Sequence, residues 1–184
     1  MKRHAPCSLL ALLLLATPLS ASLSACGASL ATLQDTLALW HHGERQAAVT
    51  RTADEYTRFR SANDLQEARV RTWADALATR VDEEPIVPRG EVASPLPGQR
   101  VDHGPGALDR ELRADLLSAR ASRIARAIGV VRGLALPQHA TGLITLIYDR
   151  RAVEADGAVL KGLDDAQRSV TLKRMALDAL EGLQ

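Results

Sequence analysis

Apolar side chains recur at steps of three and four residues along most of this chain of 184 residues. At about 100° per residue, this spacing gathers them on one face of an α-helix. The abundant alanine and leucine residues favour helices, whereas the aromatic residues that favour strands make up only 3% of the chain. The periodicity and the composition together predict an all-α fold.

Five apolar stripes locate the expected helices. They are Leu30, Leu33, Leu37 and Trp40; Val49, Ala53, Tyr56 and Phe59; Val70, Trp73, Leu77 and Val81; Leu117, Ala121, Ile124, Ile128 and Val131; and Leu172, Met175, Ala176, Ala179 and Leu183. Gly43 lies between the first two stripes, where we expect one kinked helix or two helices that meet. Residues 142–148 have the composition of a buried strand, but the sequence offers no partner strand, so we predict a helix. The stripes indicate an irregular bundle of about four to five helices.

Two pairs of residues have the spacing of a capping box and predict helix starts. They are Asp64 with Glu67, and Asp164 with Gln167. In the last helix the charged residues are expected to lie off the apolar face; they are Lys173, Arg174, Asp178 and Glu181.

Residues 82–106 have a different composition from the helical segments. They contain five of the eight prolines of the chain and four glycines. Connections longer than about 12–15 residues are uncommon in compact domains. We expect a long, flexible Pro/Gly-rich connection, either a simple crossover between helical pairs or a segment that binds a partner or acts as a gate.

The N-terminal segment has the features of a signal peptide. Lys2 and Arg3 precede an apolar run of eight residues, 9–16, which is far shorter than the ~20 residues that span a bilayer as a helix. Small residues, Ser24 and Ala25, then precede Cys26. The segment is therefore expected to be removed rather than to remain as a membrane span.

The last four residues of this segment, Leu23-Ser24-Ala25-Cys26, resemble the lipobox of bacterial lipoproteins. The resemblance covers residues 1–26 only, and we recognise no family in residues 27–184. It implies that a diacylglycerol is attached to the Cys26 sulfur. It also implies cleavage between Ala25 and Cys26, followed by acylation of the new amino group by a fatty acid such as palmitate. An ordinary secretory signal with a chance cysteine is the alternative.

The same resemblance implies a location for the mature protein. Gly27 stands where an aspartate would signal retention at the inner membrane of many Gram-negative bacteria. In a Gram-negative host, the lipoprotein would then be anchored to the outer membrane and face the periplasm. Residues 26–184 would form a single helical domain, with residues 27–29 as a leash of roughly 10 Å.

The charge and cysteine content of residues 26–184 exclude several classes of function. Without Lys2 and Arg3, 21 basic residues face 22 acidic ones, which gives no electrostatic argument for nucleic-acid binding. Cys7 is lost with the signal peptide and Cys26 would carry lipid, so no thiol remains for a disulfide or a nucleophile.

No recognisable motif for catalysis, metal binding or cofactor binding occurs in the chain, and no small-molecule substrate is evident. The adjacent His41 and His42 point ~100° apart on a helix and cannot share a metal. His103 lies in the Pro/Gly-rich segment, and His139 is expected to cap a helix or face solvent. A catalytic interpretation would require His103 or His139 within ~3 Å of a carboxylate in a deep pocket.

These observations favour a non-catalytic, lipid-anchored envelope protein whose helical domain binds a partner protein in an accessory or assembly role. Pilotins offer an analogy, not a motif match. Trp40 and Trp73, each on an apolar stripe, are either core residues or partner-binding residues. The alternative function is a periplasmic immunity or inhibitor lipoprotein that neutralises a toxin or a hydrolase.

Overall fold

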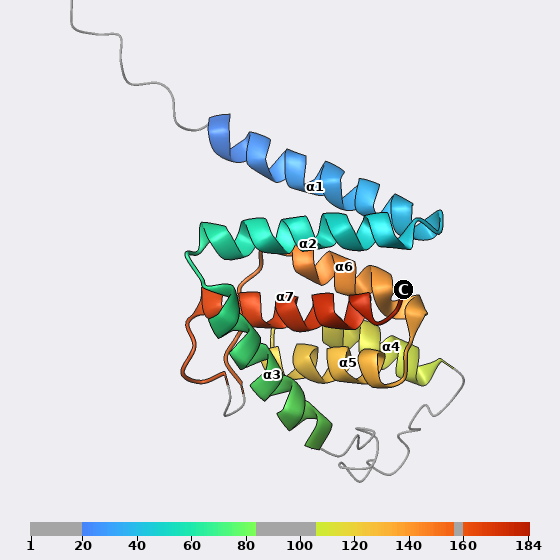
Figure 1. Cartoon of the computed structure of the whole chain (residues 1–184), viewed down its shortest axis with the longest axis vertical. Helices are drawn as coiled ribbons and strands as arrows, with labels where there is room; N and C mark the ends of the chain where they lie inside the picture. Colours follow the sequence, from blue (N-terminus) through green and yellow to red (C-terminus); the bar gives the residue numbers. More distant parts are fainter. Residues whose placement is uncertain (1–19, 84–105, 157–159) are drawn as a thin grey trace, which may run out of the picture.

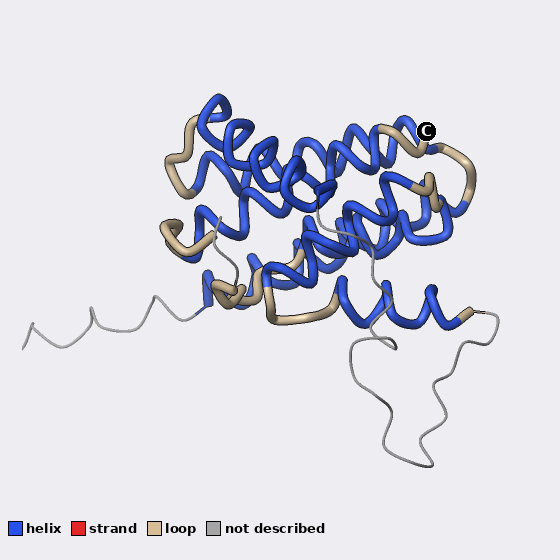
Figure 2. Tube along the Cα trace, turned by 90° about the horizontal axis from the view of Figure 1, so that it is seen from below, coloured by secondary structure: helices blue, strands red, loops and turns tan. Residues whose placement is uncertain are grey.

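The computed structural model describes the backbone of residues 20–83, 106–156 and 160–184, and side chains from Leu30 onward. These residues form seven α-helices and a short 3-10 helix, η2 (Figures 1 and 2). The helices are α1 (Ser20–His41), α2 (Arg45–Ala62), α3 (Glu67–Glu83), α4 (Ala107–Leu116), α5 (Ala121–Gly133), η2 (Pro137–His139), α6 (Ala140–Tyr148) and α7 (Asp165–Glu181). The described residues contain no strand, only an isolated bridge between Arg120 and Glu154. The all-α prediction is confirmed.

The helix predicted at residues 142–148 is confirmed as α6, but the bundle has more helices than the four to five expected. Gly43 separates two distinct helices, because its φ of +83° is a left-handed conformation that glycine adopts without strain. α3 ends where the prolines begin, and the rest of the Pro/Gly-rich connection lies outside the described residues. No helix in the described part of the chain combines the length and apolar character needed to cross a bilayer.

Helix α7 is the centre of the bundle. It packs against α2, α3, α5 and α6, and ten of its residues are buried (Figure 1). The prediction that Lys173 and Arg174 lie off the buried face is therefore wrong: they are only 2% and 7% exposed. Four surrounding helices leave little of the circumference of α7 to solvent, so charged side chains on it must find partners inside the protein.

Lys173 finds its partners at the C-terminal end of α6. Its Nζ donates hydrogen bonds to the backbone carbonyls of Leu146 (2.9 Å), Ile147 (2.8 Å) and Asp149. These carbonyls belong to the last turn of α6 and the residue after it, where backbone acceptors lack helical partners. Burial, followed by the charge of Arg150, lowers the pKa of Lys173 to about 7.

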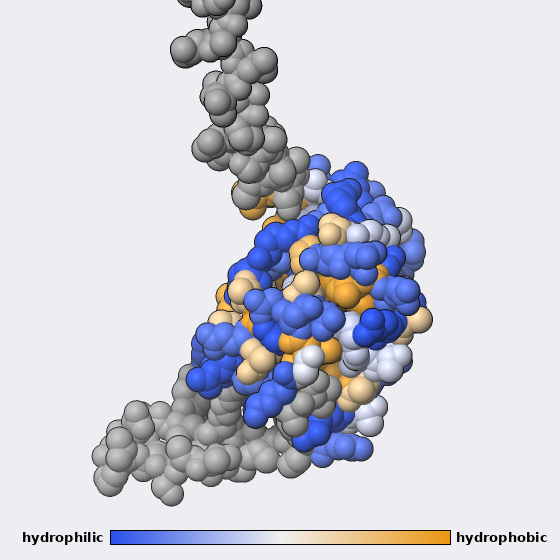
Figure 3. Space-filling model, turned by 90° about the vertical axis from the view of Figure 1, so that its left-hand side faces the viewer, coloured by the Kyte–Doolittle hydropathy of each residue, from blue (hydrophilic) through white to orange (hydrophobic). Residues whose placement is uncertain are grey.

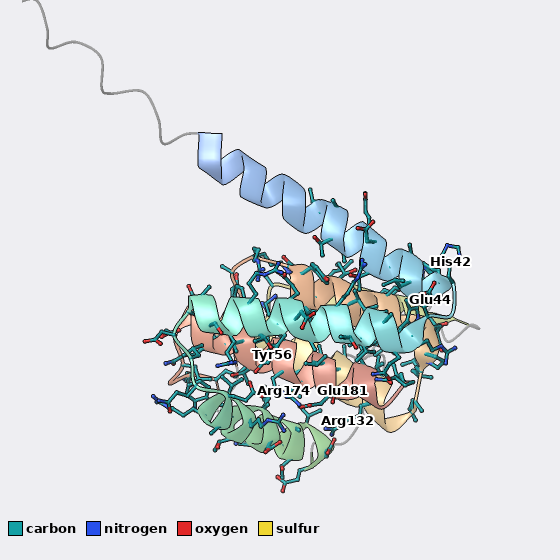
Figure 4. All side chains as sticks on the ribbon, turned by 45° about the horizontal axis from the view of Figure 1, so that its top comes forward. His42, Glu44, Tyr56, Arg132, Arg174 and Glu181 are labelled. Atoms are coloured by element: carbon teal, nitrogen blue, oxygen red, sulfur yellow. The ribbon has the colours of Figure 1, made fainter. Side chains whose placement is uncertain are left out.

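Arg174 joins α7 to α2 and α3 through Glu67. The Glu67 carboxylate accepts hydrogen bonds from the Tyr56 hydroxyl (2.8 Å), Arg71 (2.9 Å) and Arg174 (3.3 Å). Figure 4 shows Tyr56 between α2 and α7, and Arg174 on the side of α7 that faces α3. The capping box predicted for Asp64 and Glu67 is wrong. Asp64 adopts a left-handed conformation, and α3 begins only at Glu67. Glu67 uses its carboxylate in these tertiary contacts instead.

The second capping box is confirmed at the start of α7. The Asp164 side chain accepts from the Gln167 backbone N–H (2.8 Å), and the Gln167 side chain accepts from the Asp164 N–H (3.0 Å). The stripe predicted from Leu117 to Val131 is broken, because a turn separates α4 from α5. Leu117 consequently leaves the helical register and is 64% exposed.

The Lys173 ammonium makes folding stability depend on pH. In the unfolded chain its pKa returns to the ordinary value near 10.4. Between about pH 7 and that value, Lys173 is protonated in the unfolded chain but largely neutral in the folded chain. The free energy of unfolding therefore rises as pH increases through this range, and this gain is lost as pH falls to 7. We expect the free energy of unfolding of the wild type, relative to Lys173→Met, to rise between about pH 7 and pH 9. The limiting slope is about 1.4 kcal/mol per pH unit.

Urea denaturation of both proteins across this range measures the difference. Lys173→Met is the matched reference because methionine, like the stem of lysine, is unbranched and apolar but does not titrate. Parallel stability curves for the two proteins would contradict a titrating Lys173.

Candidate functional site

The predicted lipidation site lies in α1, the outermost helix of the bundle. Ala25 and Cys26 both fall within the helix, which begins at Ser20; their side chains lie outside the described residues. α1 is close to α2 at the Gly43 turn and diverges from it toward its own N-terminus (Figure 1). The backbone therefore contains no irregular linker between the predicted lipid site and the bundle.

The two tryptophans are not brought together. Trp40, at the end of α1, is only 8% exposed, and the Arg45 guanidinium lies 5.4 Å from its ring centroid. Trp73 on α3 is half-buried, with Arg69 at 5.3 Å from its ring. Of the two, Trp73 offers more surface to a partner, while Trp40 belongs to the apolar core.

The other histidines noted in the sequence give no site in the described residues. His41 and His42 are exposed at the turn between α1 and α2, where Figure 4 shows His42 near Glu44. His103 and its neighbour Asp102 lie outside the described residues. The described part of the chain contains no group of three or more histidine, cysteine, aspartate or glutamate residues that could hold a metal.

His139 occupies the N-cap position of α6, but its side chain makes no capping hydrogen bond and does not face solvent. It is 2% exposed rather than solvent-facing, and its Nε2 lies 2.8 Å from Oδ1 of Asp109. Asp109 is in the first turn of α4, and His139 is the residue before α6. The hydrogen bond from His139, with further help from Gln138 and Arg113, lowers the pKa of Asp109.

A cavity of about 350 Å³ opens beside this pair, between α4 and α6. Leu116, Leu117 and Leu146 supply its apolar lining, and Arg113, Gln138 and His139 lie among its polar groups. α4 and α6 approach closely at Gly142, where a Cβ atom would come within 2.9 Å of a methyl group of Leu116. The cavity is thus bounded by a tight helix contact as well as by the His139–Asp109 hydrogen bond.

The polar groups of this cavity differ in how far they are satisfied. Arg151 donates hydrogen bonds to the carbonyls of Leu116 (2.8 Å) and Leu117, and its Nε lies 2.6 Å from Asp149 Oδ2. The Thr145 hydroxyl donates to the Thr141 carbonyl (2.8 Å). Arg113, by contrast, is exposed and has no ion pair or side-chain hydrogen bond with any described residue.

The arrangement can orient an imidazole, because a carboxylate that holds one ring nitrogen fixes the orientation of the ring. This meets the distance that a catalytic interpretation requires. The described residues that line the cavity include no serine, cysteine or lysine that could act as a nucleophile. The nucleophile would then be water or the hydroxyl of Thr141 or Thr145, which both line the cavity.

His139 and Asp109 are 30 positions apart, and no pattern in the sequence pairs them. Only their places at helix starts offered a signal: Asp109 as an acidic residue in a first turn, and His139 after Pro137, a residue common at such positions.

The large exposed apolar residues come from different parts of the bundle. The large ones are Leu30 on α1, Leu108 on α4, Leu117 after α4 and Leu134 after α5. Hydrophilic groups dominate the face shown in Figure 3, with smaller apolar areas between them. Comparisons of the chain with models of known protein families, with curated proteins and with solved structures find no match.

The His139–Asp109 pair is expected to hold α4 against α6. Asp109→Ala leaves the buried Nε2 of His139 without a partner and should lower the free energy of unfolding by about 1–3 kcal/mol. A double-mutant cycle with His139→Ala should give a coupling energy of about 1 kcal/mol in chemical denaturation. Asp109→Asn is the matched control, because its amide oxygen can still accept the hydrogen bond. Additive effects of the two alanine substitutions would contradict the pairing.

Proposed function

We propose that this protein is a non-catalytic, lipid-anchored envelope protein whose helical domain binds a partner protein. The observation that best supports the proposal is the continuity of α1. One helix contains both the cysteine of the lipobox and Trp40, which packs into the core. A lipid on Cys26 would then be attached to a structural element of the bundle rather than to a loose tail.

The length of α1 sets how far the bundle can lie from a membrane that holds the lipid on Cys26. From Cys26 to the end of α1 the helix has 16 residues, or ~24 Å at 1.5 Å per residue. Cleavage before Cys26 would make this residue the first of the helix. The expected 10 Å leash at residues 27–29 is helical here, so the bundle would be held by a rigid arm at the bilayer surface.

The lipid supplies the membrane affinity in this proposal. Each buried CH₂ contributes ~0.8 kcal/mol, and stable anchoring needs more than one acyl chain, as a diacylglycerol provides. In a Gram-negative host, Gly27 after the cysteine favours the outer membrane, with the domain facing the periplasm. The partner would be a component of the envelope that the domain meets at that surface.

Replacing the predicted lipid site tests the anchor. We expect Cys26→Ser to abolish labelling with a fatty-acid analogue and to release the protein from the membrane fraction, because no other cysteine follows residue 26. Cys7→Ser is the matched control: it removes the other cysteine of the chain but leaves the lipobox intact. Labelling that persists in Cys26→Ser would refute the anchor.

Crosslinking in intact cells tests the partner, with the Cys7→Ser protein beside the Cys26→Ser protein. Crosslinks to an envelope assembly component that depend on Cys26 support the accessory role. Crosslinks to a toxin or a hydrolase support the immunity or inhibitor alternative. If neither protein gives a defined crosslinked species, the partner-binding proposal fails.

A second candidate function is hydrolysis, and the His139–Asp109 pair is the observation that favours it. His139 lines the cavity and would act as a general base toward water. The candidate ranks second because Asp109 already occupies Nε2, which leaves only Nδ1 for that role.

A catalytic and a structural role of the His139–Asp109 pair predict different effects of the substitution Asp109→Asn on hydrolysis. If the pair is catalytic, hydrolysis of a panel of ester and amide substrates by the wild type should fall 100-fold or more in the variant, as for other oriented general bases. If the pair is structural, the panel shows no hydrolysis above background in either protein, and the stability of the variant stays close to that of the wild type, because the amide oxygen still accepts the hydrogen bond.

A further inference from the structure

The cavity between α4 and α6 has the size and character of a small-ligand site. Its volume of about 350 Å³ lies at the lower end of the range for such sites, ~300–1,000 Å³. Leucine side chains from α4 and α6 make an apolar surface, and a few polar groups converge beside it. This combination suits a ligand with a branched apolar group and a single polar head.

The hydrogen-bonding groups around the cavity indicate the charge of that head. The nearby acceptors are engaged: Asp109 with His139 and Asp149 with Arg151, whose backbone N–H also donates to the Asp149 carboxylate (2.9 Å). Arg113 makes no side-chain hydrogen bond or ion pair with a described acceptor, although its charge helps to lower the pKa of Asp109, and it lines the cavity together with Leu116 and Leu117. Donors are therefore in surplus, which favours an acceptor-only group on the ligand.

We propose that this cavity binds a carboxylate that carries a branched apolar group. The apolar group packs against Leu116, Leu117 and Leu146, and the Arg113 guanidinium pairs with the carboxylate. The site is independent of the lipid anchor, so failure of lipid labelling at Cys26 leaves it unaffected.

Such a chemical group has two natural sources: a free branched-chain carboxylic acid, or the C-terminal residue of a polypeptide. They share the carboxylate and the apolar group. They differ in the peptide group next to the carboxylate, which only the chain end possesses.

Three probes separate these features: N-acetyl-leucine, N-acetyl-leucinamide and 4-methylpentanoate. Binding to the purified full chain is followed by the NMR shifts of the methyl groups of Leu116, Leu117 and Leu146. We expect N-acetyl-leucine to shift these methyl groups and N-acetyl-leucinamide to bind about tenfold more weakly, since it lacks the charge that pairs with Arg113. Equal binding of 4-methylpentanoate identifies a free acid, and weaker binding identifies a chain end.

Substitutions at two exposed positions, Arg113 and Leu117, test the proposed ligand site without disturbing the core. Arg113→Gln should weaken N-acetyl-leucine binding about tenfold, whereas Arg80→Gln, on α3, should leave it unchanged. Leu117→Glu, which places a negative charge at the cavity, should weaken it at least as much. Equal affinities for the acid and the amide, no effect of Arg113→Gln, or no methyl shifts up to the solubility limit of N-acetyl-leucine would overturn the proposal.

Discussion

The structure depends on two basic side chains that α7 carries inside the bundle, Lys173 and Arg174. Burying an unpaired charge costs several kcal/mol, so a helix enclosed on four sides can carry charges only where partners meet them. Lys173 meets the carbonyls at the end of α6, and Arg174 meets Glu67 on α3 and Asp178 on α7. These contacts fix how α3 and α6 sit against α7. The polar interactions therefore set the register of helices whose apolar surfaces, mostly leucine, isoleucine and alanine, could slide against one another.

Guanidinium groups join other helices in the same manner. The Nη2 atom of Arg132 on α5 donates to both carboxylate oxygens of Asp82 at the end of α3, and Arg126 on α5 donates to Asp115 on α4. A planar guanidinium can bind a carboxylate through two parallel hydrogen bonds, which specifies orientation as well as distance. The predominance of arginine over lysine in residues 26–184 thus has a structural use.

The apolar periodicity predicted most of the helices. Gly43 indicated a kink or a break, and the spacing of Asp164 and Gln167 predicted a capping box, because these are local properties. Three errors came from tertiary contacts that periodicity cannot report. Lys173 lies off the apolar stripe of its own helix, yet neighbouring helices enclose it. Glu67 has the spacing of a capping residue, but Tyr56 and Arg174 compete for its carboxylate. His139 pairs with a residue 30 positions away, and nothing in the local sequence of either one indicates the other.

Helix α6 connects the proposed anchor to the proposed ligand site. It packs against α1, where the hydroxyls of Thr36 and Tyr148 share a buried hydrogen bond of 2.9 Å. It also lines the cavity that α4 completes. α6 has only nine residues, and Lys173 holds its C-terminal end. If a ligand displaced α4, either α4 alone would move or the displacement would pass through α6 to α1. The Arg151 hydrogen bonds that hold the end of α4 to the segment after α6 favour transmission. One short helix thus contacts both the helix that carries the proposed anchor and the proposed ligand site.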